Sequence, residues 1–154
     1  MKNNAFCKKV RVEHSDALTE LLENICQENN INNYFGTISV AVNHTLEILN
    51  SEIKKAESRN ILFKFEQCVG GVAITIECQE EVFGRMLADK QQMIEMSDTS
   101  AYIVNSLADK NIVLLGGRTL ELNFFVDGIE PELLSSRREL IKLYFENKIL
   151  KTEY

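Results

Sequence analysis

A row of polar side chains interrupts the apolar stretch "VAVNHTLEILNSE", in which Asn43, Glu47 and Ser51 follow one another at intervals of four residues. Residues four apart lie on the same face of a helix, so an amide, a carboxylate and a hydroxyl would share one line. The Glu47 carboxylate is a hard oxygen ligand that suits Mg²⁺. The Asn43 amide does not titrate and cannot act as a base, but it can accept a hydrogen bond from a metal-bound water. This spacing permits a ligand site, but the favoured interpretation is a solvent-exposed or hydrogen-bonded helix face that binds no ligand.

Two amphipathic helices are predicted in the first third of the chain, and the second would carry the polar row. The first begins at Ser15 or Asp16, either of which can cap it, and ends in the asparagine-rich "ENNINN". The second is predicted over residues 37–56, because apolar residues recur there at steps of three and four. These residues are Ile38, Val42, Leu46, Leu49, Ile53 and Ala56.

The hydrophobic period then changes from that of a helix to that of a strand. Within 60–78, apolar and polar residues alternate from Phe63 to Glu66 and from Val72 to Cys78, and within 111–126 they alternate from Thr119 onwards. A glycine pair divides each stretch, at Gly70–Gly71 and at Gly116–Gly117. Each stretch is predicted to be a β-hairpin, because glycine tolerates the positive φ of tight turns. Residues 6–13 alternate in the same way and predict an edge strand. Strands with one apolar face need a covering layer, which predicts an α+β fold: a two-layer α/β sandwich whose mixed, mostly antiparallel sheet is covered by helices.

The other segments connect or extend this core. The connection between the hairpins, 79–98, is long for a structureless loop and is predicted to be partly helical, and a short helix follows it. Pro131 suits the first turn of an amphipathic helix that either packs on its own domain or faces a partner. The whole chain of 154 residues is predicted to be one domain, with a core at 6–127 and a C-terminal helical extension at 129–149.

Charge and hydropathy exclude several classes of function. The chain has 23 acidic and 17 basic residues, and its net charge of −6 repels a phosphate backbone, so nucleic acid is not an expected partner. The basic pairs Lys8–Lys9 and Arg137–Arg138 are too small to reverse this charge and are expected to be solvated. No apolar run approaches the roughly 18 residues that span a bilayer, and no signal peptide is evident. We therefore expect a cytoplasmic protein without a membrane partner.

The cysteines do not form a pattern that binds metal. They are Cys7, Cys26, Cys68 and Cys78, without a Cys-x-x-Cys pair and without adjoining histidines. A structural zinc ion needs four convergent ligands, usually supplied as close pairs, so buried reduced thiols are expected instead. No Ser-His-Asp or Cys-His pairing for nucleophilic catalysis can be assigned. His44 is expected to be an exposed or hydrogen-bonded side chain and not a phosphate acceptor.

The chain is predicted to contain, in order, a strand, two helices, a hairpin, a long connection, a short helix and a second hairpin. This order resembles the GHKL ATPase fold of histidine kinases, DNA gyrase and anti-sigma regulatory serine kinases. The likeness is greatest for the anti-sigma kinases and covers residues 6–127. One stretch that carries it is "ISVAVNHTLEILNSE", which stands where that family has a helix of the form "lalxEaxxNAxxH". The other is "SAYIVNSLADKNIVLLGGRTLELNF", which is similar to the family's small-residue helix start, "LxD", hairpin glycine and last alternating strand.

The resemblance implies that the polar row faces a nucleotide. In that family a Glu or Asn orients the water or the phosphate acceptor, an Asn four residues later holds Mg²⁺, and a basic residue or His follows. Asn43, Glu47 and Ser51 stand at these positions here. Glu47 would then hold Mg²⁺ while bringing a negative charge towards the triphosphate, and Ser51 would supply no positive charge.

Two further nucleotide elements of the family are altered. The family has Asp-x-Gly-x-Gly after the second strand of the first hairpin, where the Asp binds the adenine amino group, and no such glycine pair follows here. Its glycine-rich phosphate lid is replaced by small residues that lack glycine's freedom to point N–H groups at an anion. The candidates for the two roles are Glu77, Glu80 or Glu81 for the adenine carboxylate and Ser97, Ser100 and Ala101 for the lid.

These departures favour a non-catalytic regulatory or protein-interaction module on a degenerate GHKL ATPase-like fold, with no bound cofactor. The resemblance implies a sigma factor, an anti-sigma antagonist or an identical subunit as the partner, and a homodimer is the default. The alternative is an ATP-binding serine kinase of the anti-sigma type, with Mg²⁺ at Glu47 and a backbone cradle from residues 96–101. Phosphoryl transfer depends on positioning and charge neutralisation, so the lack of a clear phosphate cradle weighs against this alternative.

Overall fold

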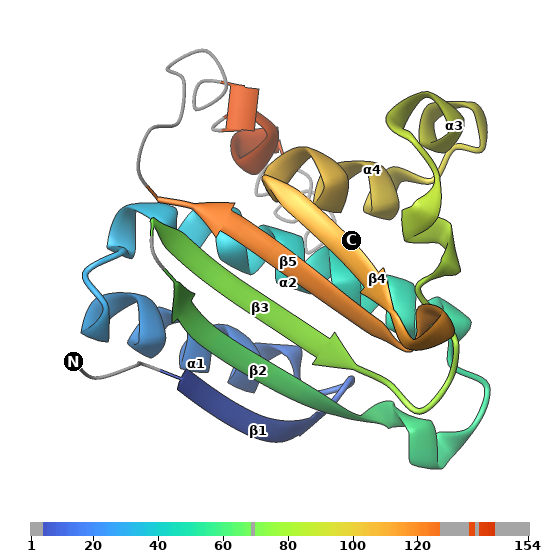
Figure 1. Cartoon of the computed structure of the whole chain (residues 1–154), viewed down its shortest axis with the longest axis horizontal. Helices are drawn as coiled ribbons and strands as arrows, with labels where there is room; N and C mark the ends of the chain where they lie inside the picture. The colour runs from blue at the N-terminus through green and yellow to red at the C-terminus, as the bar shows by residue number, and fades with distance from the viewer. Residues whose placement is uncertain (1–4, 69, 127–135, 138, 144–154) are drawn as a thin grey trace, which may run out of the picture.

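The computed structural model describes residues 5–68, 70–126, 136–137 and 139–143, which form one sheet and the helices that cover it (Figure 1). The strands are β1 (Ala5–Arg11), β2 (Asn60–Cys68), β3 (Gly71–Glu77), β4 (Lys110–Leu114) and β5 (Thr119–Phe125). The helices are α1 (Ser15–Glu28), α2 (Phe35–Glu52), α3 (Lys90–Glu95) and α4 (Thr99–Leu107). Short 3₁₀ turns occur at Asn32–Tyr34, Ala56–Arg59, Gly84–Leu87 and Leu115–Gly117.

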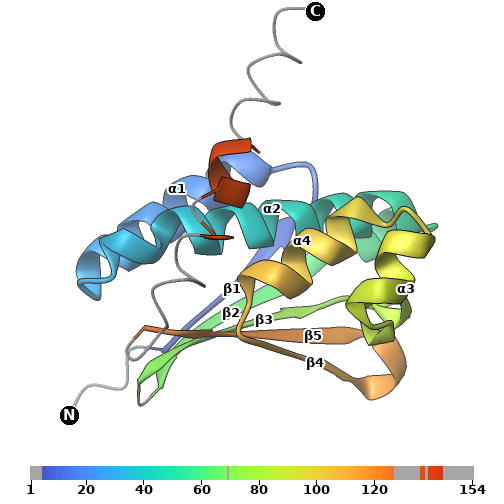
Figure 2. The same ribbon diagram turned by 90° about the horizontal axis from the view of Figure 1, so that it is seen from above.

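The sheet has the strand order β1-β2-β3-β5-β4, and every neighbouring pair is antiparallel. Ile74 at its centre stands opposite Phe65 on one side and Leu122 on the other, so the apolar residues of three strands form one continuous layer. Figure 2 shows α1, α2 and α4 on the same face of the sheet, above this layer. The predicted α+β two-layer sandwich and the predicted order of its elements are confirmed. The sheet was predicted to be mixed, but its described strands are antiparallel throughout, because hairpins and not helical crossovers join the neighbouring strands of its second half.

Helix α2 is the central helix and contacts both α1 and α4. The predicted core residues Ile38, Val42, Leu46 and Leu49 are buried, and so are Val40, Ala41 and Ile48. The helix is shorter than predicted, because Ile53 takes an extended conformation (φ −68°, ψ 128°) and Ala56 is exposed in the following turn. No helix in the described part of the chain, α2 included, is long and apolar enough to cross a membrane.

The glycines of the two hairpins have different roles. Gly70 has a φ of 78°, as a tight turn requires, whereas Gly71 is needed for space, because a Cβ there would lie 2.3 Å from the carbonyl oxygen of Phe124. The second hairpin turns through Leu115, Gly116 and Gly117, with φ of 52°, 65° and 100°. Both predicted turns are confirmed, and the first also allows β5 to approach β3 closely.

The connection between the hairpins is partly helical, as predicted, and contains a 3₁₀ turn and α3. Phe83, Met86 and Met93 are buried in the core, whereas Leu87 and Ile94 are exposed. The connection therefore forms a layer beside α4 that is attached to the core by these three buried side chains.

The described residues of the C-terminal extension, 136–137 and 139–143, are helical and pack on the domain. Ile141 lies 3.7 Å from the position that a Cβ on Gly36 would take, next to α2. Arg137 is 5% exposed, so the expectation that it is solvated was wrong. Its guanidinium is paired with Asp109, just after α4. The rest of the predicted helix, including Arg138, lies outside the described residues.

Candidate functional site

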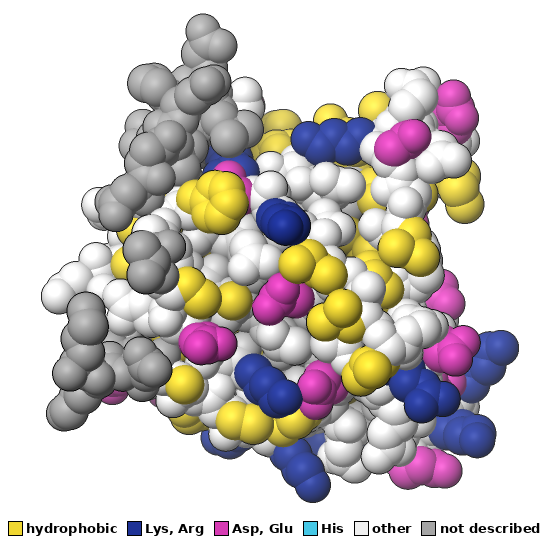
Figure 3. All heavy atoms as spheres, in the orientation of Figure 1, with side chains coloured by type: hydrophobic (Ala, Val, Ile, Leu, Met, Phe, Trp, Pro, Cys, Tyr) yellow, Lys and Arg dark blue, Asp and Glu magenta, His cyan; other side chains and the backbone are white. Residues whose placement is uncertain are grey.

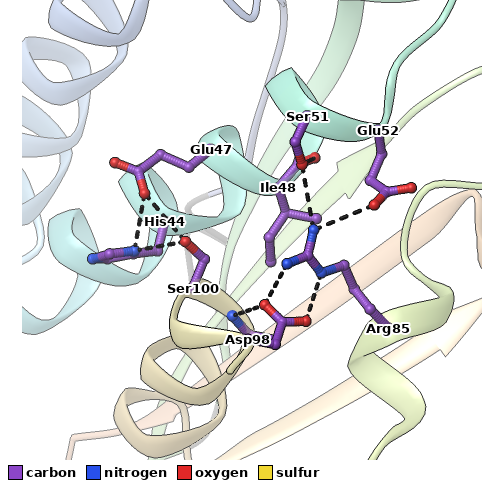
Figure 4. A network of polar contacts seen from close by, with 9 residues as sticks. His44, Glu47, Ile48, Ser51, Glu52, Arg85, Asp98 and Ser100 are labelled. Carbon is purple, nitrogen blue, oxygen red and sulfur yellow. Dashed lines mark hydrogen bonds and ion pairs between the residues drawn. The ribbon is translucent and has the colours of Figure 1, made fainter. Parts of the chain in front are cut away.

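The second half of α2 and the start of α4 border a shallow hollow of about 370 Å³. The hollow contains Glu47 and Ser51 of the predicted polar row and Ser97 and Ser100 of the predicted lid. The other residues that line it are Ile48, Arg85, Asp98 and Thr99. The fold therefore brings together side chains that are about fifty residues apart in the sequence (Figure 4).

Asn43 lies outside this hollow, one turn earlier on α2. Its amide nitrogen donates to the carbonyl oxygen of Ser39 at 2.8 Å and to the hydroxyl of Thr19 at 3.4 Å. These bonds attach Asn43 to its own helix and to α1. The polar row is therefore divided at Glu47, with Asn43 on one side and Ser51 on the other.

A second hollow, of about 380 Å³, opens on the Asn43 side, and Asn43, Glu47, Glu13 and Arg59 help to line it. Glu13 and Arg59 are paired with each other in it. Arg59 and then Arg11 bind the Glu13 carboxylate and lower its pKa to about 2. Of the two carboxylates that line this hollow, that of Glu13 is therefore already neutralised by two guanidinium groups.

Glu47 shares its carboxylate with two polar side chains. The hydroxyl of Ser100 donates to Glu47 Oε2 at 3.1 Å, while His44 Nδ1 lies 3.3 Å from the same oxygen and 3.2 Å from Ser100 Oγ (Figure 4). We assign the His44 proton to Nδ1, because the single hydroxyl proton cannot satisfy both a carboxylate and an imidazole lone pair. Both His44 and Ser100 then donate to Glu47. Ser100 is therefore a hydrogen-bond donor and is not activated as a nucleophile by His44.

Arg85, from the 3₁₀ turn before α3, binds the Asp98 carboxylate with two nitrogens. Nε donates to Oδ2 at 2.7 Å, and Nη2 donates to Oδ1. Asp98 is the N-cap of α4, and its Oδ1 also accepts a hydrogen bond from the backbone N–H of Ala101 at 3.3 Å. The hydrogen bonds from Arg85 keep the pKa of Asp98 below its ordinary value, against the effect of burial, which raises it. A carboxylate of the same chain thus occupies the N-terminus of α4.

The same guanidinium reaches across to α2. Its Nη1 donates to the Ser51 hydroxyl and to the Glu52 carboxylate, in each case at 3.3 Å. The Ser51 hydroxyl in turn donates to the carbonyl oxygen of Ile48 at 2.9 Å. Arg85 therefore joins the end of α2 to the start of α4 across the hollow (Figure 4).

The hollow is acidic on balance. The carboxylates of Glu47, Glu52 and Asp98 face a single guanidinium, that of Arg85. A phosphate charge about 4 Å from Glu47 would be repelled by roughly 4 kcal/mol at an effective dielectric constant of about 20. The arrangement suits hydrogen-bond donors or a cationic group and opposes a polyanion.

The carboxylates predicted to share the site lie elsewhere. Ile74 and Ile76 are fully buried on the helix side of the sheet, so Glu77 points to the opposite face, where it pairs with Lys64 at 3.0 Å. Figure 3 views this open face, on which charged and hydrophobic side chains are mixed. Glu80 accepts hydrogen bonds from the backbone N–H groups of residues 54 and 55, which lower its pKa. Glu81 lies against the glycine turn of the second hairpin.

The residues that the structure describes contain no group of three or more His, Cys, Asp or Glu side chains that could hold a metal ion. Glu47, the predicted Mg²⁺ ligand, has one oxygen already engaged by Ser100 and His44. Any cation bound there would depend on Glu47 with help mainly from water.

The four thiols divide into two classes. Cys26 and Cys78 are buried, as expected. Cys7 and Cys68 are exposed, contrary to expectation, because alternation along β1 and β2 places them on the face of the sheet opposite to the buried Val12 and Phe65. Burial raises the pKa of the Cys26 thiol to about 11, so it is unreactive near neutral pH.

Sequence reasoning did not single out Arg85 or Asp98, although they form the most connected pair of the site. Asp98 had a usable signal, because an aspartate directly before a helical "TSAY" is typical of an N-cap. Arg85 had none, because nothing in its local sequence distinguishes it from the other cations. Its partner lies 13 residues away and is brought to it by the turn of the connection.

The fold and site together define an α+β domain with a polar, acidic hollow that an arginine–aspartate pair spans. Comparison of the sequence with models of known protein families gives no match, and comparison with curated proteins gives no significant match.

Proposed function

We propose that this protein is a non-catalytic regulatory module that acts by binding another protein and that it uses a degenerate fold of the GHKL ATPase type. The observation that carries the proposal is the state of the α4 N-terminus. Asp98 caps this helix and is bound by two nitrogens of Arg85, at the point where a nucleotide phosphate would need free backbone N–H groups.

The charges around this point support the same conclusion. A triphosphate would have to displace Asp98 from Arg85 and from the Ala101 N–H, and it would still meet the exposed carboxylate of Glu47. The positive end of the helix dipole, which would favour an anion, is already neutralised by Asp98. Strong binding of a polyanion is therefore not expected.

The residues that the resemblance expects around the adenine base also give little support to a nucleotide site. Glu77, which stands where the resemblance expects the adenine carboxylate, points to the open face of the sheet and pairs with Lys64. Asn43 uses its amide to bond to α1 and to its own helix. We therefore expect no cofactor in the working protein.

The second candidate is an ATP-binding serine kinase of the anti-sigma type with a divergent site, in which Glu47 would hold Mg²⁺. One observation favours it: the hydroxyl-bearing residues Ser97, Thr99 and Ser100 surround the start of α4 beside Glu47. Hydroxyl groups and backbone N–H groups at a helix start are chemically suited to phosphate oxygens.

Thermal unfolding with and without 1 mM ATP or ADP and 5 mM Mg²⁺ separates the two candidates. A ligand at about one hundred times its dissociation constant adds about 2.7 kcal/mol to the free energy of unfolding, which is easily detected as a rise in Tm. The regulatory proposal predicts no rise. It also predicts that Asp98→Ser, which keeps a capping hydroxyl and removes the carboxylate, binds pyrophosphate more strongly than the wild-type protein does.

A rise in the wild-type Tm that is abolished in Glu47→Ala and retained in Glu77→Ala would establish the ATP-binding candidate instead. Glu77→Ala is the matched control, because it removes a carboxylate of the same kind from the opposite face of the sheet. A rise that survives both substitutions would place the nucleotide elsewhere and would also contradict the proposal.

The proposal includes a protein partner of the kind that the resemblance implies, a sigma factor or an anti-sigma regulator, and a homodimer as the default assembly. It places the protein in the cytoplasm, where the free thiols Cys7 and Cys68 stay reduced. Measurement of the molar mass at micromolar concentration tests the assembly, and a strictly monomeric protein would remove the homodimer from the proposal.

A further inference from the structure

Strand β1 forms one edge of the sheet and has a complete, unpaired row of backbone groups. It pairs with β2 without interruption from Ala5 opposite Glu66 to Arg11 opposite Asn60, and it contains no proline or bulge. Within the described part of the chain it pairs with no other strand. Edge strands of this kind can accept a further strand, and proteins usually protect them with proline, bulges or charged side chains such as lysine. Of these devices β1 has only the charged side chains, which oppose a basic or identical strand but attract an acidic one.

The direction of the free backbone groups follows from one hydrogen bond. The N–H of Val12 donates to the carbonyl oxygen of Arg59 at 3.0 Å, which continues the β1–β2 register. Hydrogen-bonded pairs alternate along an antiparallel ladder, so the backbone groups of Lys8 and Val10 point into the sheet. Those of Cys7 and Lys9 therefore point away from it, towards an added strand.

A hollow of about 210 Å³ lies between this edge and α1. Its rim is basic, and its floor, on the helix side, is apolar. Lys8, Lys9 and Arg11 are on its polar side, and Val10, Leu18 and Leu21 are on its apolar side. No carboxylate is among the residues that line it. Figures 1 and 2 show β1 at the edge of the sheet with α1 beside it.

The charge of this edge is opposite to that of the whole molecule. The chain has a net charge of −6, yet the lysines at positions 8 and 9 make no ion pair with any residue in the described part of the chain. Arg11 already has a partner in Glu13. A second copy of β1 would place lysines against lysines across an antiparallel pair, which is unfavourable. An acidic segment would meet complementary charge.

We propose that the edge of β1 is the docking site for an acidic, extended segment of a partner polypeptide, which adds to the sheet as a sixth strand. Side chains alternate between the two faces of such a strand, so one set would enter the apolar floor formed by Val10, Leu18 and Leu21. The other set would lie on the open face, where carboxylates reach Lys9. The preferred segment therefore alternates apolar and acidic residues. This inference rests on the proposed function, whose partner it describes.

A fluorescently labelled eight-residue peptide of alternating glutamate and valine tests the proposal by anisotropy at about 50 mM salt. We expect it to bind the wild-type protein, with affinity that falls as salt is raised. Lys9→Glu should weaken binding about tenfold, whereas Lys110→Glu should not, because Lys110 lies on the opposite edge strand. The same peptide with lysine in place of glutamate should not bind.

Cys7→Pro separates strand addition from simple charge attraction. It removes an outward N–H without changing the charge, and proline is tolerated at an edge strand when its missing N–H faces solvent. We expect this variant to keep its circular dichroism spectrum and Tm but to lose peptide binding. In the wild-type protein the amide of Lys9 should exchange more slowly with solvent when the peptide is bound.

Two outcomes would overturn the proposal. The first is absence of binding at millimolar peptide, or binding that Lys9→Glu and Cys7→Pro leave unchanged. The second is a wild-type dimer that Cys7→Pro converts to a monomer, which would make a second copy the occupant. Neither outcome affects the nucleotide experiment, because β1 contributes no residue to the hollow beside Glu47.

Discussion

Helix α4 is held at each end by an arginine–aspartate pair, and the two pairs have different surroundings. At its start, the side chains of Arg85 and Asp98 are 27% and 9% exposed and line the hollow. After its end, the side chains of Arg137 and Asp109 are 6% and 7% exposed, and the pair is enclosed. The same two residue types thus form the wall of a hollow in one place and an internal attachment in the other.

The contacts of the enclosed pair explain its role. Asp109 accepts hydrogen bonds from Arg137 at 2.7 Å and from the backbone N–H of Phe125 at 2.6 Å, while Arg137 Nε donates to the carbonyl oxygen of Ser106 at 3.4 Å. The pair therefore connects the C-terminal segment, α4 and the last strand. Burial, and not residue type, therefore decides whether a charge pair is available to a ligand.

The largest effect is expected for the enclosed pair. Arg137→Met, which keeps an unbranched apolar stem and removes the guanidinium, should lower the free energy of unfolding by about 3–5 kcal/mol, because it leaves Asp109 buried without its cation. Urea unfolding followed by circular dichroism measures this loss. Arg85→Met is the matched control and should cost less than half as much, because water reaches that pair. Equal losses would show that the two ends of α4 do not differ as described.

A smaller effect is expected at the start of α4. Asp98→Ala removes a helix cap, typically worth about 1 kcal/mol, together with a partly exposed ion pair, so a loss of about 1–2 kcal/mol is expected. Glu52→Ala removes a carboxylate that contacts the same Arg85 but is 46% exposed. It should change stability by no more than about 0.5 kcal/mol. If the two substitutions cost the same, Asp98 does not hold the helix start.

The fold was predictable because its signals are local. The apolar line of Ile38, Val42 and Leu46 defines a helix through a period that short stretches of sequence contain, and each hairpin is defined by alternation around a glycine pair. The helix end at Glu52 was missed because Ile53 and Ala56 continue the apolar spacing after the backbone has left the helix. Periodicity reports which side chains can be buried but does not locate the last helical turn.

The site was less predictable because its contacts are not local. The pairing of Arg85 with Asp98, and of Arg137 with Asp109, depends on how the connection and the C-terminal segment pack. The position of Glu77, by contrast, was predictable. It follows Ile76 in a strand, and alternation alone places it on the face away from the helices. The sequence was therefore enough to exclude Glu77 from the site, whereas the partners of the two arginines could be found only from the structure.

The smallest expected effect is a pH dependence of the unfolding free energy, which separates the charge of Asp98 from its role as a helix cap. Asp98→Asn keeps an equally good cap and removes the charge. Arg85 lowers the folded-state pKa of Asp98 below its ordinary value of 3.8, so on acidification the unfolded chain takes up this proton first. The stabilisation by the pair is then complete well above pH 3.8 and is lost as the pH falls through that value towards the folded-state pKa.

The difference in unfolding free energy between the wild-type protein and Asp98→Asn should therefore be greatest near neutral pH and should shrink towards pH 3. Even at neutral pH this difference should be smaller than the stability lost in Asp98→Ala. Urea unfolding at a series of pH values measures it. Glu13, with a pKa of about 2 but a side chain that is 40% exposed, provides the comparison. The contribution of Glu13 should fade in 0.5 M salt, whereas that of the better-buried Asp98 should persist. A difference for Asp98 that is constant with pH, or that grows in acid, would mean that its charge does not stabilise the start of α4.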